Sequence, residues 1–148
     1  MRQDIPLGLL IDIIRRSHII HLNAELKKFG ITASGFMIMM YLSEKQNVIQ
    51  DDVARHFHID KSAIARAVQK LESAGFVQRI VEPTNRRASH LFLTEKGTEI
   101  IPEMVQIDKL WEEKTLAGAS EEKISQVYLL LGEMVQNSLI IAGRYGDE

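Results

Sequence analysis

The sequence of 148 residues contains no cysteine. Disulfide bonds, thiol redox sensing and thiolate metal sites are therefore excluded. The sequence also shows no secretory signal, and the apolar stretch Ile5 to Ile11 is too short to cross a bilayer. The charged residues Asp12, Arg15 and Arg16 follow that stretch at once. We therefore expect a cytoplasmic protein with no membrane partner.

Catalytic motifs are also lacking. The sequence has no glycine-rich phosphate loop, no nucleophile elbow and no paired carboxylates in an apolar setting. The acidic pairs Glu112-Glu113 and Glu121-Glu122 are typical of solvated helix faces. A small enzyme is an alternative that these absences disfavour, and we expect neither an enzyme nor a bound cofactor.

The charges of the two signs nearly balance overall but are unevenly distributed along the chain. The net charge is −2, and hydrophobic residues make up 45% of the chain, enough for a folded core. Residues 1–60 are neutral, residues 61–94 carry +4, and residues 95–148 carry −6. A basic middle segment between neutral and acidic ends predicts a nucleic-acid surface on one face, although ordinary surface charge is an alternative.

The basic segment lies within a characteristic order of elements between Gln50 and Gly97. A helix, a turn at residues 57–59 and a second helix that ends at Gly75 are followed by a strand over residues 76–81. A polar turn over residues 83–89 and a strand over residues 90–93 complete a hairpin. This order indicates a mainly α fold with a small β-hairpin wing, a winged helix-turn-helix.

The second helix has one apolar face and one polar face. Ile64, Val68 and Leu71 recur at helical spacing and should pack inward, while Asp60 is placed to cap the helix N-terminus. The opposite face is small and polar with one long cation, which suits the DNA major groove, whereas a solvated helix would more often carry Glu and Lys pairs there. We predict that this helix contacts DNA through Lys61, Ser62, Ala65, Arg66, Gln69 and Lys70.

The two ends of the chain predict long helices with wide apolar coverage. We expect helices over residues 5–28, 95–116 and 121–142, the first roughly 36 Å long. Their apolar stripes are wider than one small domain can bury, so a second copy of the chain is the simplest partner. Residues 1–30 and 95–148 should therefore form a helical dimerisation region, and residues 31–94 a winged helix-turn-helix DNA-binding domain.

At these residues the chain resembles the MarR family of transcriptional regulators. The resemblance rests on the run from Asp60 to Phe76, on Asn85-Arg86-Arg87, and on the exit from Leu93 to Gly97. It implies a homodimer with one winged helix per subunit. Arg86 and Arg87 at the wing tip should enter the minor groove of DNA or bind phosphates, although a hairpin charged only for solubility is an alternative. The resemblance favours Arg87 over Arg86, because Arg87 matches the wing arginine of the family. Two positions depart from the family pattern: Asn85 replaces an Asp that orients the wing arginine, and Ala65 replaces a Thr.

The resemblance also implies a response to a small molecule. Family members commonly bind anionic or phenolic compounds between the dimer helices and the winged helix. Arg16 borders the apolar stripe of the first helix beside His21, so these two residues are the candidates for binding an anionic aromatic effector, although an intersubunit or surface arginine is an equal alternative. The implied function is a repressor that binds a pseudo-palindromic operator and is released by its effector.

Two further alternatives concern metals and partners. His18 and His21 lie one helical turn apart, and His56 and His58 flank the turn before the second helix, but no cysteine and few acids accompany them, so we expect no metal site. A winged helix can also serve as a protein-binding module without DNA. Such a module would carry an apolar anchor where Ser62, Ala65 and Arg66 stand.

Overall fold

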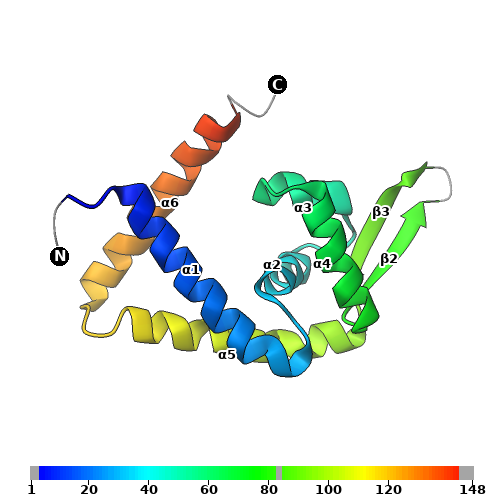
Figure 1. Ribbon diagram of the computed structural model, residues 1–148, viewed down its shortest axis with the longest axis horizontal. Helices are drawn as coiled ribbons and strands as arrows, with labels where there is room; N and C mark the ends of the chain where they lie inside the picture. The colour runs from blue at the N-terminus through cyan, green and yellow to red at the C-terminus, as the bar shows by residue number, and fades with distance from the viewer. Residues whose placement is uncertain (1–3, 83–84, 144–148) are drawn as a thin grey trace. The chain divides into compact units, whose positions relative to one another are not determined.

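The computed structural model describes the backbone of residues 4–82 and 85–143. Within these ranges it describes every side chain except those of residue 82 and residues 85–88. The chain divides into two compact units, Met1–Trp111 and Glu112–Glu148. The predicted functional division at residues 31–94 stays a prediction. Figure 1 labels the helices α1 to α6 and the strands β2 and β3.

The first unit contains the predicted winged helix-turn-helix. Its elements are α1 (Leu7–Leu26), η1 (Lys27–Phe29), α2 (Ala33–Glu44), β1 (Val48–Ile49), α3 (Gln50–Phe57), α4 (Lys61–Ser73), β2 (Val77–Glu82), β3 (Asn85–Leu93) and the greater part of α5 (Glu95–Thr115). The predicted fold class, mainly helical with a small β wing, is confirmed.

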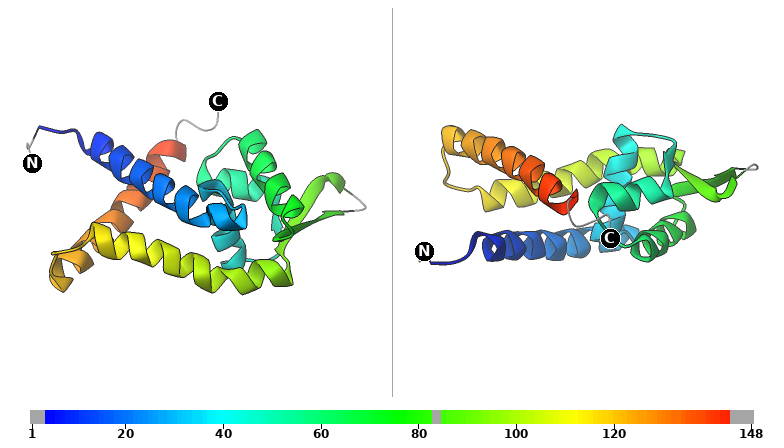
Figure 2. Two further views of the ribbon diagram at one scale, coloured as in Figure 1. Left: turned by 60° about the horizontal axis from the view of Figure 1, so that its bottom comes forward. Right: turned by 90° about the horizontal axis from the view of Figure 1, so that it is seen from above.

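The sheet has the strand order β1-β3-β2, with both pairs antiparallel. Val48 pairs with Leu91 and Val77 pairs with Leu93, so β3 lies in the middle and bonds to both neighbours. In both views of Figure 2 the β2–β3 hairpin projects beyond the helices of this unit. The wing is thus anchored at its base by β1 and by the buried side chains of Val77, Leu91 and Leu93.

The predicted turn over residues 83–89 is wrong in part, because β3 already begins at Asn85. Backbone pairing extends to Glu82 and Asn85, with an irregularity in register between Val81 and Glu82. The segment from Asn85 to Ser89 is polar, so it lacks the apolar alternation that signals a strand. Strand pairing uses backbone groups, which composition does not reveal.

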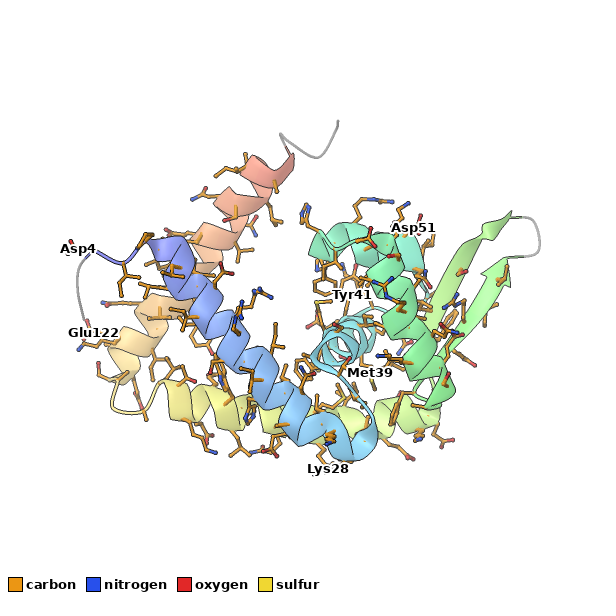
Figure 3. All side chains as sticks on the ribbon, in the orientation of Figure 1. Asp4, Lys28, Met39, Tyr41, Asp51 and Glu122 are labelled. Carbon is orange, nitrogen blue, oxygen red and sulfur yellow. The ribbon has the colours of Figure 1, made fainter. Side chains whose placement is uncertain are left out.

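The core of the first unit lies where α2 and α4 meet α1 and the sheet. Ile64, Val68 and Leu71 of α4 are buried as predicted, because their spacing places them on one helix face. Met39 of α2, labelled in Figure 3, is fully buried beside them. Because this face of α4 packs against the core, the opposite face remains exposed to solvent.

The apolar stripe of α5 is mostly covered by its own unit, which differs from the sequence-based expectation that a second copy covers it. Met104 and Ile107 are buried, and Ile100 and Ile101 pack against the core. Trp111 lies against the His18 ring of α1, with 4.5 Å between ring centroids. On α5, only Leu110 remains a large exposed apolar side chain among the described residues.

Helix α6 (Glu121–Gly143) makes up most of the second unit and has no buried residue within this chain. Its exposed large apolar side chains include Leu129 at 68% and Ile140 at 59% exposure. The N-terminal half of α1 is similar, with Leu7 and Ile13 more than half exposed. Among the described residues α6 is also the one helix long and apolar enough to cross a membrane, by length and composition alone.

Candidate nucleic-acid interface

Asp60 caps the N-terminus of α4, as predicted. The Asp60 carboxylate accepts hydrogen bonds from the backbone N–H groups of Ser62 (2.9 Å) and Ala63 (3.2 Å). The Ser62 hydroxyl and these two N–H groups hold the pKa of Asp60 below its usual value, because each stabilises the ionised carboxylate. The helix therefore begins at a defined residue and in a defined direction.

The outer face of α4 is exposed and polar. Lys61, Ser62, Arg66, Gln69 and Lys70 are all exposed, and Ala65 is half-buried. These are the residues that the sequence predicted for DNA contact, and the structure brings them together on one helix of a helix-turn-helix. An apolar anchor, which a protein-binding module would need, is lacking among these described side chains.

Arg66 is held along this face rather than free in solvent. Its Nη1 donates to the Ser62 hydroxyl at 3.1 Å, and that hydroxyl in turn donates to the Asp60 carboxylate. Ser62 and Arg66 are four residues apart, the spacing at which helical side chains meet. The sequence therefore contained a signal for this contact that our prediction did not use.

Lys61 is paired within the protein. Its Nζ lies 2.6 Å from the Asp51 carboxylate of α3, and Figure 3 labels Asp51 on that helix. The pair is exposed, so it contributes little to stability. A phosphate would compete with Asp51 for this ammonium group, which reduces what Lys61 adds to DNA affinity.

The wing is attached to the rest of the unit by side chains at its base. The His90 ring lies 2.8 Å from the Asn47 side-chain oxygen, and Gln46 accepts from the Leu93 backbone N–H at 3.1 Å. Arg86 and Arg87 lie in β3, but their side chains fall outside the described residues, so their predicted DNA contacts stay predictions.

A cleft of about 1070 Å³ lies beside α4 within the first unit. Apolar side chains of α1 and α2, including Leu22, Phe36 and Met37, form much of its wall. Two of its cations, Arg66 and Lys70, belong to α4 itself. A molecule in this cleft would therefore touch the recognition helix directly.

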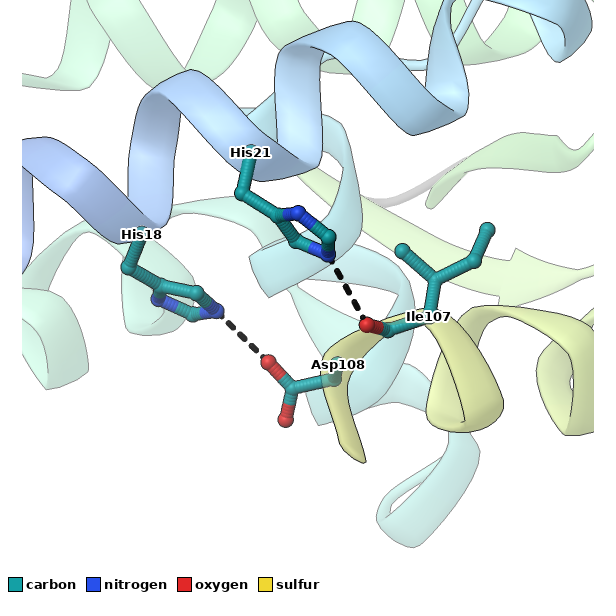
Figure 4. A network of polar contacts seen from close by, with 4 residues as sticks. All are labelled: His18, His21, Ile107 and Asp108. Carbon is teal, nitrogen blue, oxygen red and sulfur yellow. Dashed lines mark hydrogen bonds and ion pairs between the residues drawn. The ribbon is translucent and has the colours of Figure 1, made fainter. Parts of the chain in front are cut away.

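The predicted effector residues are not at this cleft. Arg15 lines it, whereas Arg16 and His21 do not. Adjacent helical positions differ by about 100° in direction, so Arg15 and Arg16 face different surroundings. The His21 ring instead contacts the Ile107 backbone oxygen of α5 at 3.0 Å, which Figure 4 shows.

His18 lines the cleft and also contacts α5. Its Nε2 lies 2.6 Å from an Asp108 carboxylate oxygen, beside the His21 contact in Figure 4. Its ring contacts the Trp111 ring at a tilt of 39°. The His56 ring contacts the Tyr41 ring at a tilt of 31°, with 4.5 Å between ring centroids. Among the described residues no three His, Asp or Glu side chains are grouped to hold a metal ion.

The fold and this site define a winged helix-turn-helix protein of the DNA-binding type. The MarR family model matches residues 31–89, which span α2 to the middle of β3. A crystal structure of MarR is 30% identical, with a TM-score of 0.92 over 97% of this chain and 98% of that one. A MarR transcriptional regulator from Methanosarcina mazei Go1 is also 30% identical, with a TM-score of 0.88 over 91% and 97% of the two chains.

A sequence relative supports the same conclusion. The helix-turn-helix transcriptional regulator YybA of Bacillus subtilis is 29% identical over 115 residues, which cover 78% of this chain and 77% of that protein. The chain belongs to the MarR family, whose members are DNA-binding transcriptional regulators and not enzymes. The resemblance inferred from the sequence is confirmed.

Proposed function

We propose that this chain is a repressor that reads a pseudo-palindromic operator as a homodimer and releases it when a small anionic aromatic molecule binds. The observation that carries the proposal is the exposed polar face of α4, with Arg66 held in place beside Ser62. A helix of this kind fits the major groove, where arginine pairs with the two acceptors of guanine.

The homodimer is supported by the apolar surface of the terminal helices. Leu7 and Ile13 of α1 and Leu129 and Ile140 of α6 leave much apolar area exposed in a single chain. A second copy would bury these side chains, in an interface on the order of 2,000 Å² or more. A soluble dimer acting on DNA would be cytoplasmic. It would use α6 for association rather than for a membrane.

Sedimentation tests this association. We expect a dimer at micromolar concentration, and Leu129→Glu together with Ile140→Glu should give a folded monomer. Lys123→Glu, an exposed change near the start of the same helix, is the matched control and should leave the dimer intact. A folded wild-type monomer at micromolar concentration would contradict the homodimer.

The effector response is supported by the cleft beside α4. Its apolar wall suits an aromatic ring, and Arg15 offers a cation for a carboxylate. Because Arg66 and Lys70 also line the cleft, a bound acid would alter both the position and the charge of the recognition helix. Coupling is reciprocal: an effector that weakens DNA binding tenfold must itself bind tenfold more weakly to the DNA complex.

Selection from random double-stranded DNA tests the proposed function. Two recognition helices related by a two-fold axis should enrich a site whose half-sites are about 10 base pairs apart. Placing that site over a promoter should lower reporter expression, and a salicylate-like acid should restore it. An enriched site without dyad symmetry, or a reporter that the protein activates, would overturn this form of the proposal.

A further inference from the structure

A continuous set of hydrogen bonds runs along the exposed start of α4. The Asp60 carboxylate accepts from the backbone N–H groups of Ser62 and Ala63. The Ser62 hydroxyl donates to the same carboxylate oxygen and accepts from Arg66 Nη1 at 3.1 Å. The guanidinium is therefore connected, through one hydroxyl, to a carboxylate that the helix backbone itself fixes.

This connection leaves Arg66 able to bind DNA. A guanidinium has five N–H donors, and the bond to Ser62 uses one of them, so others remain for a base edge. A free arginine loses much rotamer freedom when it orders on DNA. Arg66 already donates a hydrogen bond to Ser62 in the free protein, and this bond restricts its rotamers, so less freedom remains to be lost on binding.

The same geometry limits what Ser62 can do alone. A hydroxyl has a single donor, and Ser62 gives its donor to Asp60. One of its two acceptor sites is occupied by Arg66. Donating to a base would require Ser62 to give up the contact with Asp60.

We propose that Ser62 and Asp60 are positioning residues that hold Arg66 for base readout, and that Ser62 is not itself a base contact. This inference rests on the proposed sequence-specific DNA binding by α4. Asp60, Ser62 and Arg66 together then produce the discrimination at one base position of each half-site. Of these three residues, only Arg66 contacts DNA.

The test uses the full-length protein and the operator that the wild type enriches, with each base of a half-site changed in turn. The binding constants of Ser62→Ala, Arg66→Ala and their double variant are compared with wild type. Ser62→Thr keeps the hydroxyl and serves as the rescue. Ser73→Ala is the matched control, because Ser73 is an exposed serine of α4 whose hydroxyl donates only within its own turn, to Gln69 O. Urea unfolding confirms that each variant folds.

Arg66→Ala should abolish the discrimination between bases at one position of the half-site. We expect Ser62→Ala to lower the discrimination at that same position about two- to tenfold. Ser62→Thr should restore it, Ser73→Ala should not change it, and Ser62→Ala should add nothing to Arg66→Ala. Wild-type discrimination in Ser62→Ala, a loss at a different base position, or losses that add in the double variant would overturn the inference. A wild type that enriches no sequence would instead overturn the proposed function, and the inference with it.

Discussion

Arg79 of β2 and Glu72 of α4 form an ion pair in which Arg79 Nη2 lies 3.0 Å from Glu72 Oε2. Both side chains are mostly buried, with exposures of 27% and 31%. The pair joins the first strand of the wing to the end of the recognition helix. These are the two elements that a winged helix presents to DNA, so the pair helps to fix their relative orientation.

Removing the Glu72 charge should therefore weaken both folding and DNA binding. Glu72→Gln should lower the free energy of unfolding by about 1 kcal/mol, because Arg79 would keep its charge in a mostly buried position without its partner. Urea unfolding measures this loss. Glu99→Gln, an exposed carboxylate on α5, is the control and should change little. Equal effects of the two substitutions would count against a special role for the pair.

The cap at Asp60 gives a defined pH dependence. Its hydrogen bonds lower the folded-state pKa of Asp60 below 3.8. The ionised form therefore adds stability above about pH 3.8, and that contribution disappears as the pH falls through the folded-state value. The difference in unfolding free energy between wild type and Asp60→Asn should be constant between about pH 7 and pH 5 and should shrink below pH 3.8. A difference that grows as the pH falls would contradict this sign.

Gly97 allows the start of α5 to approach the segment between α4 and β2. A methyl group at Gly97 would lie 2.0 Å from the Phe76 backbone oxygen, so the backbone would have to move. Gly97→Ala should therefore lower the free energy of unfolding by about 2 kcal/mol or more. Denaturant titration measures this loss, and a value below about 0.5 kcal/mol would contradict the close approach of Gly97 to the Phe76 backbone.

The cleft gives a prediction that separates two neighbouring arginines. Arg15→Ala should raise the concentration of a salicylate-like acid needed to release operator DNA by about tenfold, because Arg15 lines the cleft and Arg16 does not. Arg16→Ala is the matched control, one position away on α1 and also exposed. Release is followed by fluorescence anisotropy of labelled operator. If only Arg16→Ala raised the acid concentration needed for release, Arg16 would be the effector-binding residue, as the sequence predicted.

Local signals predicted the helix-turn-helix well. The spacing of Ile64, Val68 and Leu71 and the capping position of Asp60 depend only on neighbours within a few residues. Such features follow from helix geometry and from the free N–H groups at a helix start. The sequence was therefore sufficient to choose the face of α4 that remains exposed.

Features set by distant packing were not predictable in the same way. The apolar stripe of α5 indicated a partner, but periodicity cannot say that His18 and the core of the same chain cover much of it. The pairing of Glu72 with Arg79 depends on how β2 meets α4. The choice between Arg15 and Arg16 depends on where the cleft lies, and only the packed helices of the first unit define that.

The most direct test of the central claim compares wild type and Arg66→Ala on the enriched operator and on random DNA of the same length. In the proposed complex Arg66 reads a base edge from the exposed face of α4. Fluorescence anisotropy should show a loss of about 1–3 kcal/mol on the operator and a much smaller loss on random DNA. An equal loss on both DNAs would make Arg66 a phosphate contact and would contradict the account.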